Sequence, residues 1–387
     1  MEIKIKALTP IWTGGVEGKP DRLHETGIIG SMRWWYEAIV RGLGGYVCDP
    51  TGDKRCELSG KEKTQEERLT KLCPACYLFG CGGWKRRFVL HIENVPTIPL
   101  HFRTSVNMNK NWLKRIFGGE YQNIDGISVF YGDMTVRIII RTDDVDYIRS
   151  QLIMLFNFIS RYGGLGAKLQ HGFGQIRVLE SESVSGDSVI RVGLKELKKK
   201  IQANVFSEGQ KVNTPYTLEN FVSLDYDLPS SSLKIFMQNN SHIGHNTKFQ
   251  ENRYIPCAFD LRYKGSEQFG MRKWLKNDKD WSESDEPKQL GQLDKLLGPR
   301  STWKSNGKWK EIDDNLRTAS RLYFGMPYKS ANNDYRLRVF GFAPPDVLEP
   351  HKLKELCEEY MQHVFSQRCN PVRVTLGSDI IKGLGGT

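Results

Sequence analysis

The chain has 387 residues, of which 39% are hydrophobic and 26% charged, as in globular proteins, and this length favours two domains over one core. Lys and Arg outnumber Asp and Glu by 56 to 45, and the net charge of +11 favours a polyanionic partner without identifying one. No apolar run reaches the roughly 18 residues of a membrane span, so we expect no membrane partner.

The first half of the chain alternates between strand and helix patterns. The opening MEIKIK alternates like a strand and differs from a signal peptide, so we expect a cytoplasmic protein. Apolar residues then recur at helical spacing from Ile29 to Leu43, and strands follow at 86–95 and 134–142. A second helix covers 143–162, and FGQIRVLES reads as a closing strand. This order of strand, helix, strand, strand, helix, strand is the split βαβ, or ferredoxin-like, pattern.

The second half of the chain repeats this order less clearly. Residues 180–230 are serine-rich and charged, which predicts a linker containing a helix; strands at 232–238, 337–345 and 371–376 and a helix at 349–365 follow. CYLFGCGGWKRR and RLYFGMPYK share a Phe-Gly element, which supports duplication. We predict an α+β protein of two tandem ferredoxin-like (RRM-like) domains with insertions: residues 1–182, a linker at 183–230, and residues 231–387.

Five of the eight cysteines lie between Cys48 and Cys81. Thiols or a metal site fit a cytoplasmic chain better than disulfides do. Cys73-Pro-Ala-Cys76 has the spacing that places two thiolates on one ion. We therefore take Cys56, Cys73, Cys76 and Cys81 as candidates for a structural zinc site, with buried free thiols as the alternative. No other cofactor is expected.

The segment GGLGAKLQHGFG, residues 163–174, contains five glycines. It is not a P-loop, because Lys168 is not followed by Ser or Thr, and not a dinucleotide fingerprint, because the helix precedes the strand. Successive amides without side chains can bind an anion, and glycine lets a ribose-phosphate chain approach closely. Arg161, Lys168 and His171 would add charge. The alternative is a tight helix-to-strand connection with left-handed glycines.

These motifs resemble a known family. The helix followed by GGLGAKLQHGFG and a strand resembles the glycine-rich loop of the RAMP superfamily of CRISPR-associated proteins. The segments LTPIWTGG and GIIGSMRWWYEAIVRGLGG are similar to the first-subunit family of the Cmr complex, the type III-B CRISPR effector. The resemblance implies RRM-like domains and a non-catalytic subunit that binds crRNA and target RNA near the crRNA 3′ end, contacts other Cmr subunits and serves antiviral defense.

Several residues are candidates for RNA contact. Gly30 and Ser31 are expected to open the first helix with free amides, and Lys85–Arg87 form a basic run beside a tryptophan. Arg33 has a surface pair with Glu37 as its alternative role, and Trp34 has domain packing. The predicted RNA-binding residues are Gly30, Ser31, Arg33, Trp34, Arg41, Lys85, Arg86, Arg87, Arg161, Gly164, Gly166, Lys168, His171 and Gly172; weaker candidates are Arg103, Lys110 and the segment 239–248.

A competing hypothesis is a metal-independent RAMP endoribonuclease that processes CRISPR RNA. A histidine would act there as general acid or base, and a lysine would stabilise the phosphorane. His24, His171 and Lys168 are the candidates for these roles. We expect no enzymatic activity, because each histidine is equally well explained as a hydrogen-bonded loop residue.

Overall fold

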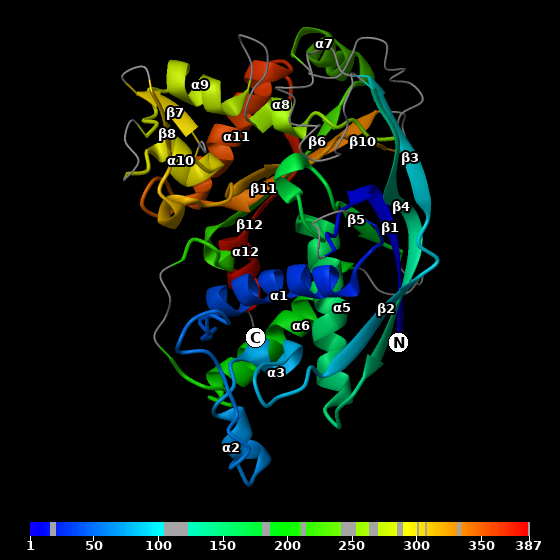
Figure 1. The fold of residues 1–387 in the computed structure, drawn as a ribbon, viewed down its shortest axis with the longest axis vertical. Coiled ribbons are helices and arrows are strands. Elements are labelled where there is room, and N and C mark those ends of the chain that lie inside the picture. The colour runs from blue at the N-terminus through cyan, green and yellow to red at the C-terminus, as the bar shows by residue number, and fades with distance from the viewer. Residues whose placement is uncertain are drawn as a thin grey trace.

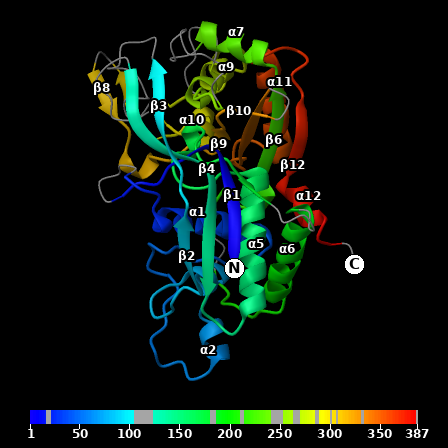
Figure 2. The same cartoon turned by 90° about the vertical axis from the view of Figure 1, so that its right-hand side faces the viewer.

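The computed structural model describes residues 1–15, 21–103, 123–179, 186–209, 214–240, 253–262, 270–284, 289–299, 302–305, 308–330 and 334–385. Two antiparallel five-stranded sheets, each accompanied by helices, account for most of these residues, and a two-stranded ladder is attached to the second sheet's half (Figures 1 and 2). No helix in the described ranges combines the length and the apolar character that crossing a bilayer requires.

The first sheet is built from β1 (Glu2–Ile11), β2 (Phe88–Glu93), β3 (Thr97–Arg103), β4 (Asn123–Ile140) and β5 (Ile176–Val178). Its order is β2-β4-β1-β5, with all neighbours antiparallel. Strand β4 is long because it pairs with β3 along its first part and with β2 along its last. In β1 the predicted alternation is confirmed: Ile3 and Ile5 are buried, and Glu2 and Lys4 are exposed.

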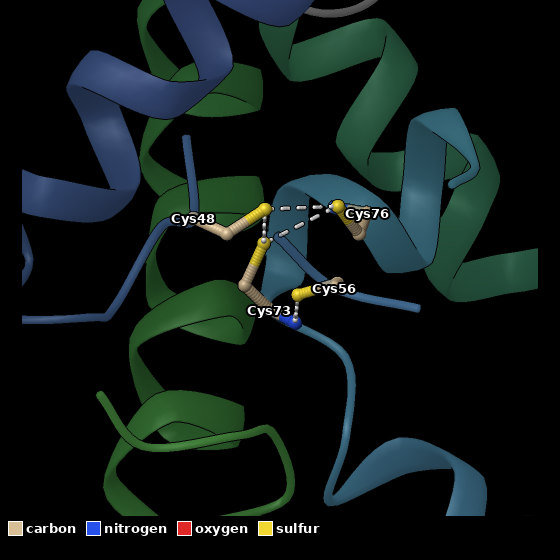
Figure 3. A group of neighbouring side chains, drawn as sticks. All are labelled: Cys48, Cys56, Cys73 and Cys76. Carbon is tan, nitrogen blue, oxygen red and sulfur yellow. Dashed lines mark hydrogen bonds between the residues drawn. The ribbon is translucent and has the colours of Figure 1, made fainter. Parts of the chain in front are cut away.

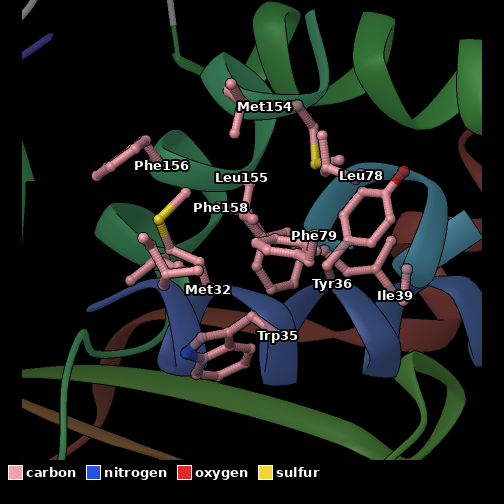
Figure 4. Close-up of a cluster of buried hydrophobic side chains, with 14 of the residues drawn as sticks. Met32, Trp35, Tyr36, Ile39, Leu78, Phe79, Met154, Leu155, Phe156 and Phe158 are labelled. Carbon is pink, nitrogen blue, oxygen red and sulfur yellow. The ribbon is translucent and has the colours of Figure 1, made fainter. Parts of the chain in front are cut away.

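Helices α1 (Glu25–Gly42) and α5 (Val145–Tyr162) pack with the inward side chains of β1 and β4 into the first core. Figure 4 shows the centre of this core, where α1, α5 and the short helix α3 (Pro74–Phe79) meet. Both long helices follow from the apolar spacing in the sequence, and α5 ends at the predicted Gly163. Between α1 and α3, the short helix α2 (Gln65–Leu69) buries none of its residues and begins at the Thr64 cap.

The second sheet contains β6 (Phe221–Leu228), β9 (Leu322–Phe324), β10 (Tyr328–Lys329), β11 (Tyr335–Phe342) and β12 (Pro371–Leu376). Its order is β10-β11-β6-β12, with β9 also on β11, so the chain visits it in the same sequence as the first sheet. The remaining elements are α7 (Ser230–Asn240), α8 (Ala258–Arg262), α9 (Met271–Asp278), α10 (Gln292–Leu297), β7 (Thr302–Ser305), β8 (Lys308–Glu311), α11 (Pro350–Val364) and α12 (Gly377–Lys382).

Two parts of the expected linker prove to be packed structure. Helix α6 (Gly186–Gln202) lies against α5, where a side chain on Gly193 would come within 2.8 Å of Met154 Cγ. Residues 221–228 form the strand β6 between β11 and β12. The polar composition of β6 was misleading, because its buried Asp225 is neutralised by arginines of the neighbouring strands.

Two predicted elements of the second half are wrong. Residues 232–238 lie in helix α7, because Leu233, Phe236 and Met237 are spaced to bury one helical face while Ile235 is exposed. The Phe-Gly repeat is not structural: Phe79 ends helix α3, whereas Phe324 ends strand β9. The short shared motif therefore reflects similar letters in different backbones.

The two halves share aromatic packing. The ring of Trp35 on α1 contacts Phe221, Phe340 and Phe342 of the second sheet, with centroids 5.7–6.0 Å apart. In return, Trp12 at the end of β1 is part of the second core. Offset and edge-on aromatic contacts of this kind add to the energy of area burial, so the sheets are held together by packed rings.

Candidate functional site

The glycine-rich segment 163–174 connects α5 to β5 and contains the 3-10 turn Leu169–His171. Gly166, Gly172 and Gly174 have φ angles of 93°, 84° and 81°, in the left-handed region that glycine adopts without strain. Lys168 also lies there, with φ 61°. The alternative interpretation, a tight connection with left-handed glycines, therefore describes the backbone.

The close neighbours of these glycines belong to the protein itself. A Cβ on Gly163 would lie 2.6 Å from Trp35 Cη2, and one on Gly166 would lie 2.7 Å from the carbonyl oxygen of Trp12. A Cβ on Gly172 would meet Ala258 Cβ at 2.8 Å. No real Cβ atom sits that close to its neighbours, so intramolecular packing alone accounts for glycine at these positions.

Many amides of the segment donate hydrogen bonds within the chain. The N–H groups of Leu165, Ala167 and Gly174 donate to backbone carbonyls at 2.8 Å, and that of Gly166 donates to Ser31 Oγ at 3.0 Å. The expectation of open amides across the segment is therefore wrong for these positions. Contact with a ligand would have to come from side chains at its edge, such as the half-buried Lys168, whose Nζ lies 5.8 Å from the Trp12 ring centre.

The segment also joins the two halves. The carbonyl of Gly172 accepts hydrogen bonds from Thr9 Oγ1 and from the N–H of Met326, at 3.1 and 3.2 Å. The buried Gln175 donates through Nε2 to the carbonyl of Met326 at 2.8 Å. Gly164 accepts from Trp35 Nε1 at 2.8 Å. Residues that were expected to face RNA thus form a wedge between the sheets.

His171 stacks on Phe259 with ring centroids 6.0 Å apart. Burial, with further contributions from Arg262 and Lys168, lowers the pKa of His171 to about 3. Its imidazole is therefore neutral at pH 7. His24 lies elsewhere, immediately before α1, where its Nε2 is 2.7 Å from Asp21 Oδ1.

The first helix begins at Glu25, so Gly30 and Ser31 lie in its second turn and do not supply free N-terminal amides as expected. Gly30 is exposed, and no atom lies within 4 Å of the position that a Cβ would take there. Trp34 packs against Trp35, Tyr216 and Phe342, which is the domain-packing role given as its alternative.

The arginines of α1 are bonded inside the protein. Arg33 Nε donates to Glu37 at 2.8 Å, Nη1 to the Gly80 carbonyl at 3.0 Å and Nη2 to Cys76 Sγ at 3.3 Å. Arg41 donates to Glu37 and to the carbonyl of Tyr216, both at 3.3 Å. Arg33 thus has the surface-pair partner considered for it, together with contacts that tie α1 to α3.

The basic run before β2 is partly exposed. Lys85 is exposed, Arg86 donates to the carbonyl of Phe88 at 2.7 Å, and the Arg87 guanidinium lies 3.4 Å from the Trp84 ring centre. Stacking of this kind holds the arginine flat against the ring. Among the weaker candidates, Arg103 ends β3, and Lys110 and residues 241–248 lie outside the described residues.

A cleft of about 520 Å³ lies where α5, β5 and the second sheet meet, and it is rich in arginine. Its walls carry two acidic side chains, Asp187 and Asp225; its basic side chains are Arg161, Arg177, Arg336, Arg338 and Arg373. Only Arg161 was predicted from the sequence. The signal for Arg336 and Arg338 was the alternation YRLR, which places both arginines on one face of β11.

The inner arginines of this cleft hold the end of α5. Arg338 Nη1 donates to the carbonyls of Ser160 and Gly163 at 2.9 and 3.2 Å, and Arg373 donates to that of Arg161 at 2.8 Å. Both arginines also pair with the buried Asp225. The last carbonyls of α5, which no helical N–H can reach, are thus satisfied by the second sheet.

The outer arginines are more accessible. The Arg161 side chain is 42% exposed and pairs with Asp187 at 2.8 Å, and Arg336 makes a two-pronged pair with Asp227. Arg177 on β5 is exposed and makes no ion pair within the described part of the chain. It lies directly opposite Lys6 in the β1–β5 ladder. Like charges placed opposite one another are unfavourable unless an anion lies between them.

The cysteine cluster differs from the predicted set by one residue. Cys48, Cys56, Cys73 and Cys76 are buried, and their sulfur atoms all lie within 4.8 Å of one another (Figure 3). Cys81 is outside this group: its Sγ faces the carbonyl of Gly82, and burial raises its pKa to about 11. The CxxC pair was recognisable from its spacing, but the choice between Cys48 and Cys81 depended on the folded loops.

Comparisons with known proteins bear on this geometry. Residues 4–177 match the RAMP superfamily, which confirms the family resemblance seen in the sequence. No curated protein matches the chain. Two solved structures resemble it: Cmr1 from Pyrococcus furiosus in its apo form, 14% identical with a TM-score of 0.38, covering 88% of this chain and 87% of that one, and the type III-B Cmr-beta bound to cognate target RNA, 13% identical with a TM-score of 0.43, covering 94% and 99%.

Proposed function

Because residues 4–177 belong to the RAMP superfamily, we propose that this protein is a non-catalytic RNA-binding subunit of a type III-B CRISPR (Cmr) effector complex. In this role it binds crRNA and target RNA near the crRNA 3′ end, contacts neighbouring Cmr subunits and works in the cytoplasm in antiviral defense. The similarity of LTPIWTGG and GIIGSMRWWYEAIVRGLGG to the first Cmr subunit supports this assignment.

The sheet order supports two ferredoxin-like domains. In the first sheet the strands that open and close the βαββαβ order are β1 and β5, which are neighbours; in the second they are β6 and β12, also neighbours. The two middle strands of each unit then lie on the other side of the opening strand, with a helix in each crossover. This is the arrangement expected of the split βαβ motif used twice.

The arginine-rich cleft is the observation that carries RNA binding. Its lining has five arginines against two aspartates, and Arg177 adds an exposed cation beside Lys6. A low-dielectric wall concentrates the field of such a cluster, and phosphates release counterions when they bind it. Arg161, Arg177 and Arg336 on the outer walls are the side chains proposed to reach phosphate, while Arg338 and Arg373 hold the wall in place.

Charge reversal at Arg177 tests the proposal. Fluorescence anisotropy with labelled single-stranded RNA and with an RNA duplex, over a series of salt concentrations, measures affinity and its salt dependence. Losing one phosphate contact should lower the slope of log K against log salt by about 0.7 for a single strand. Arg177→Glu should therefore bind more weakly and with a shallower slope.

Arg149→Glu is the matched control. Arg149 is half exposed on α5 but lies twelve residues before Arg161, about 18 Å along the helix axis at 1.5 Å per residue. It should bind RNA as the unchanged protein does. Equal affinity and slope in Arg177→Glu and the unchanged protein would show that the cleft is not the RNA site.

The absence of catalysis is also part of the proposal. A neutral His171 with its pKa near 3 cannot donate a proton as general acid at pH 7, which supports a binding role. Repeat RNA incubated with the protein in chelator should stay intact. Specific fragments that disappear with His24→Ala would instead establish the endoribonuclease.

A further inference from the structure

The four buried cysteines come from three separate pieces of chain. Cys48 follows the end of α1, Cys56 lies in the insertion before α2, and Cys73 and Cys76 flank the start of α3. The sulfur of Cys48 lies 3.4 Å from that of Cys76 and 3.9 Å from that of Cys73. Figure 3 shows the four side chains directed toward one another.

We propose that Cys48, Cys56, Cys73 and Cys76 bind one structural zinc ion. With Zn–S bonds of about 2.3 Å, the sulfur atoms of a tetrahedral site lie about 3.8 Å apart. The observed separations, all within 4.8 Å, enclose a space of that size. Because all four ligands are protein thiols and all are buried, no position is left for a substrate, as is typical of a structural rather than a catalytic zinc.

Groups around the sulfur atoms suit thiolate ligands. The N–H of Cys73 donates to Cys56 Sγ at 3.3 Å, and the N–H of Cys76 donates to Cys73 Sγ at 3.4 Å. Arg33 Nη2 donates to Cys76 Sγ at 3.3 Å. Donors of this kind fix the orientation of metal ligands, and the arginine offsets part of the negative charge of four thiolates on a divalent ion. Arg33, first considered for phosphate contact, thereby gains a specific role.

The ion would organise the insertion between α1 and α3. This stretch has little regular structure beyond the five-residue α2, and few of its side chains are buried. Its Leu58 N–H donates to the Gly82 carbonyl at 2.9 Å, so the insertion also supports the turn that leads to Lys85–Arg87. A chain segment with so small a core needs a covalent or metal link to hold one conformation. The inference stands independently of RNA binding.

Metal analysis of the full chain tests the site. Protein produced with zinc should carry about one zinc per chain by inductively coupled plasma mass spectrometry. Cys48→Ser should lose most of this zinc, whereas Cys81→Ser should keep it, because Cys81 lies outside the cluster. The reverse result would assign the metal to the set that includes Cys81 and overturn the proposal.

Unchanged protein provides a second test if Cys48→Ser does not fold. Replacement of zinc by Co²⁺ should give the visible absorption bands of a tetrahedral thiolate site, and a chelator should release the metal and make residues 49–72 sensitive to protease. Failure of zinc-supplied protein to retain metal, or a disulfide among these cysteines found by mass spectrometry of the freshly purified chain, would overturn the site.

Discussion

Gly163→Ala tests whether the glycine-rich segment serves packing. The added methyl group would lie 2.6 Å from Trp35 Cη2, and Trp35 is 1% exposed among aromatic rings of both halves. The φ of −133° is open to alanine, so the cost is steric. Overfilling such a site costs about 1–3 kcal/mol, and a shifted indole would also lose its 2.8 Å bond to Gly164, worth about 1 kcal/mol. We therefore expect a loss of about 2–4 kcal/mol.

The assay is urea unfolding followed by intrinsic tryptophan fluorescence and circular dichroism, with RNA affinity measured in parallel on folded protein. Gly30→Ala is the matched control, because nothing lies within 4 Å of the position its Cβ would take. Alanine is favoured over glycine inside a helix, so this control should be stabilised by up to about 1 kcal/mol. Neither change should alter RNA affinity.

One result would refute the reasoning. If Gly163→Ala were as stable as the unchanged protein but bound RNA more weakly, the glycine would be needed to admit a ligand. The open-amide interpretation of the sequence would then be restored, and the contact with Trp35 would be too soft to matter.

Two other expectations follow from buried charges. Asp225→Asn should lower the free energy of unfolding by about 3–5 kcal/mol, because Arg338 and Arg373 would lose a buried carboxylate; an unchanged urea midpoint would show that their helix-end carbonyls suffice. For His171, the folded pKa of about 3 lies below the ordinary 6.5, so the unfolded chain binds the proton first as pH falls. The stability due to neutral His171 is present above pH 6.5 and lost progressively toward pH 3, so between about pH 7 and 5 the unchanged protein should lose more stability than His171→Gln; parallel pH profiles would contradict this.

The sequence by itself determined the elements whose signal is local. The stripes of α1 and α5, the alternation of β1 and the stop at Gly163 all depend on neighbours within a turn or two, and the structure has each of them. The motifs in residues 4–177 were also sufficient to identify the family. Local reasoning was weakest where composition conflicts with burial, as in β6, whose Asp225 is buried only because distant arginines neutralise it.

Tertiary structure alone decided what the motifs are for. Gly163 is a glycine because Trp35, far away in the sequence, occupies the space of its side chain, and Cys48 replaces Cys81 in the cluster because loops whose path no local pattern determines bring it there. The arginines of the cleft gather from α5, β5, β11 and β12. Periodicity describes how a segment relates to itself, whereas a site depends on distances between segments, and those distances exist only after the two sheets have packed together.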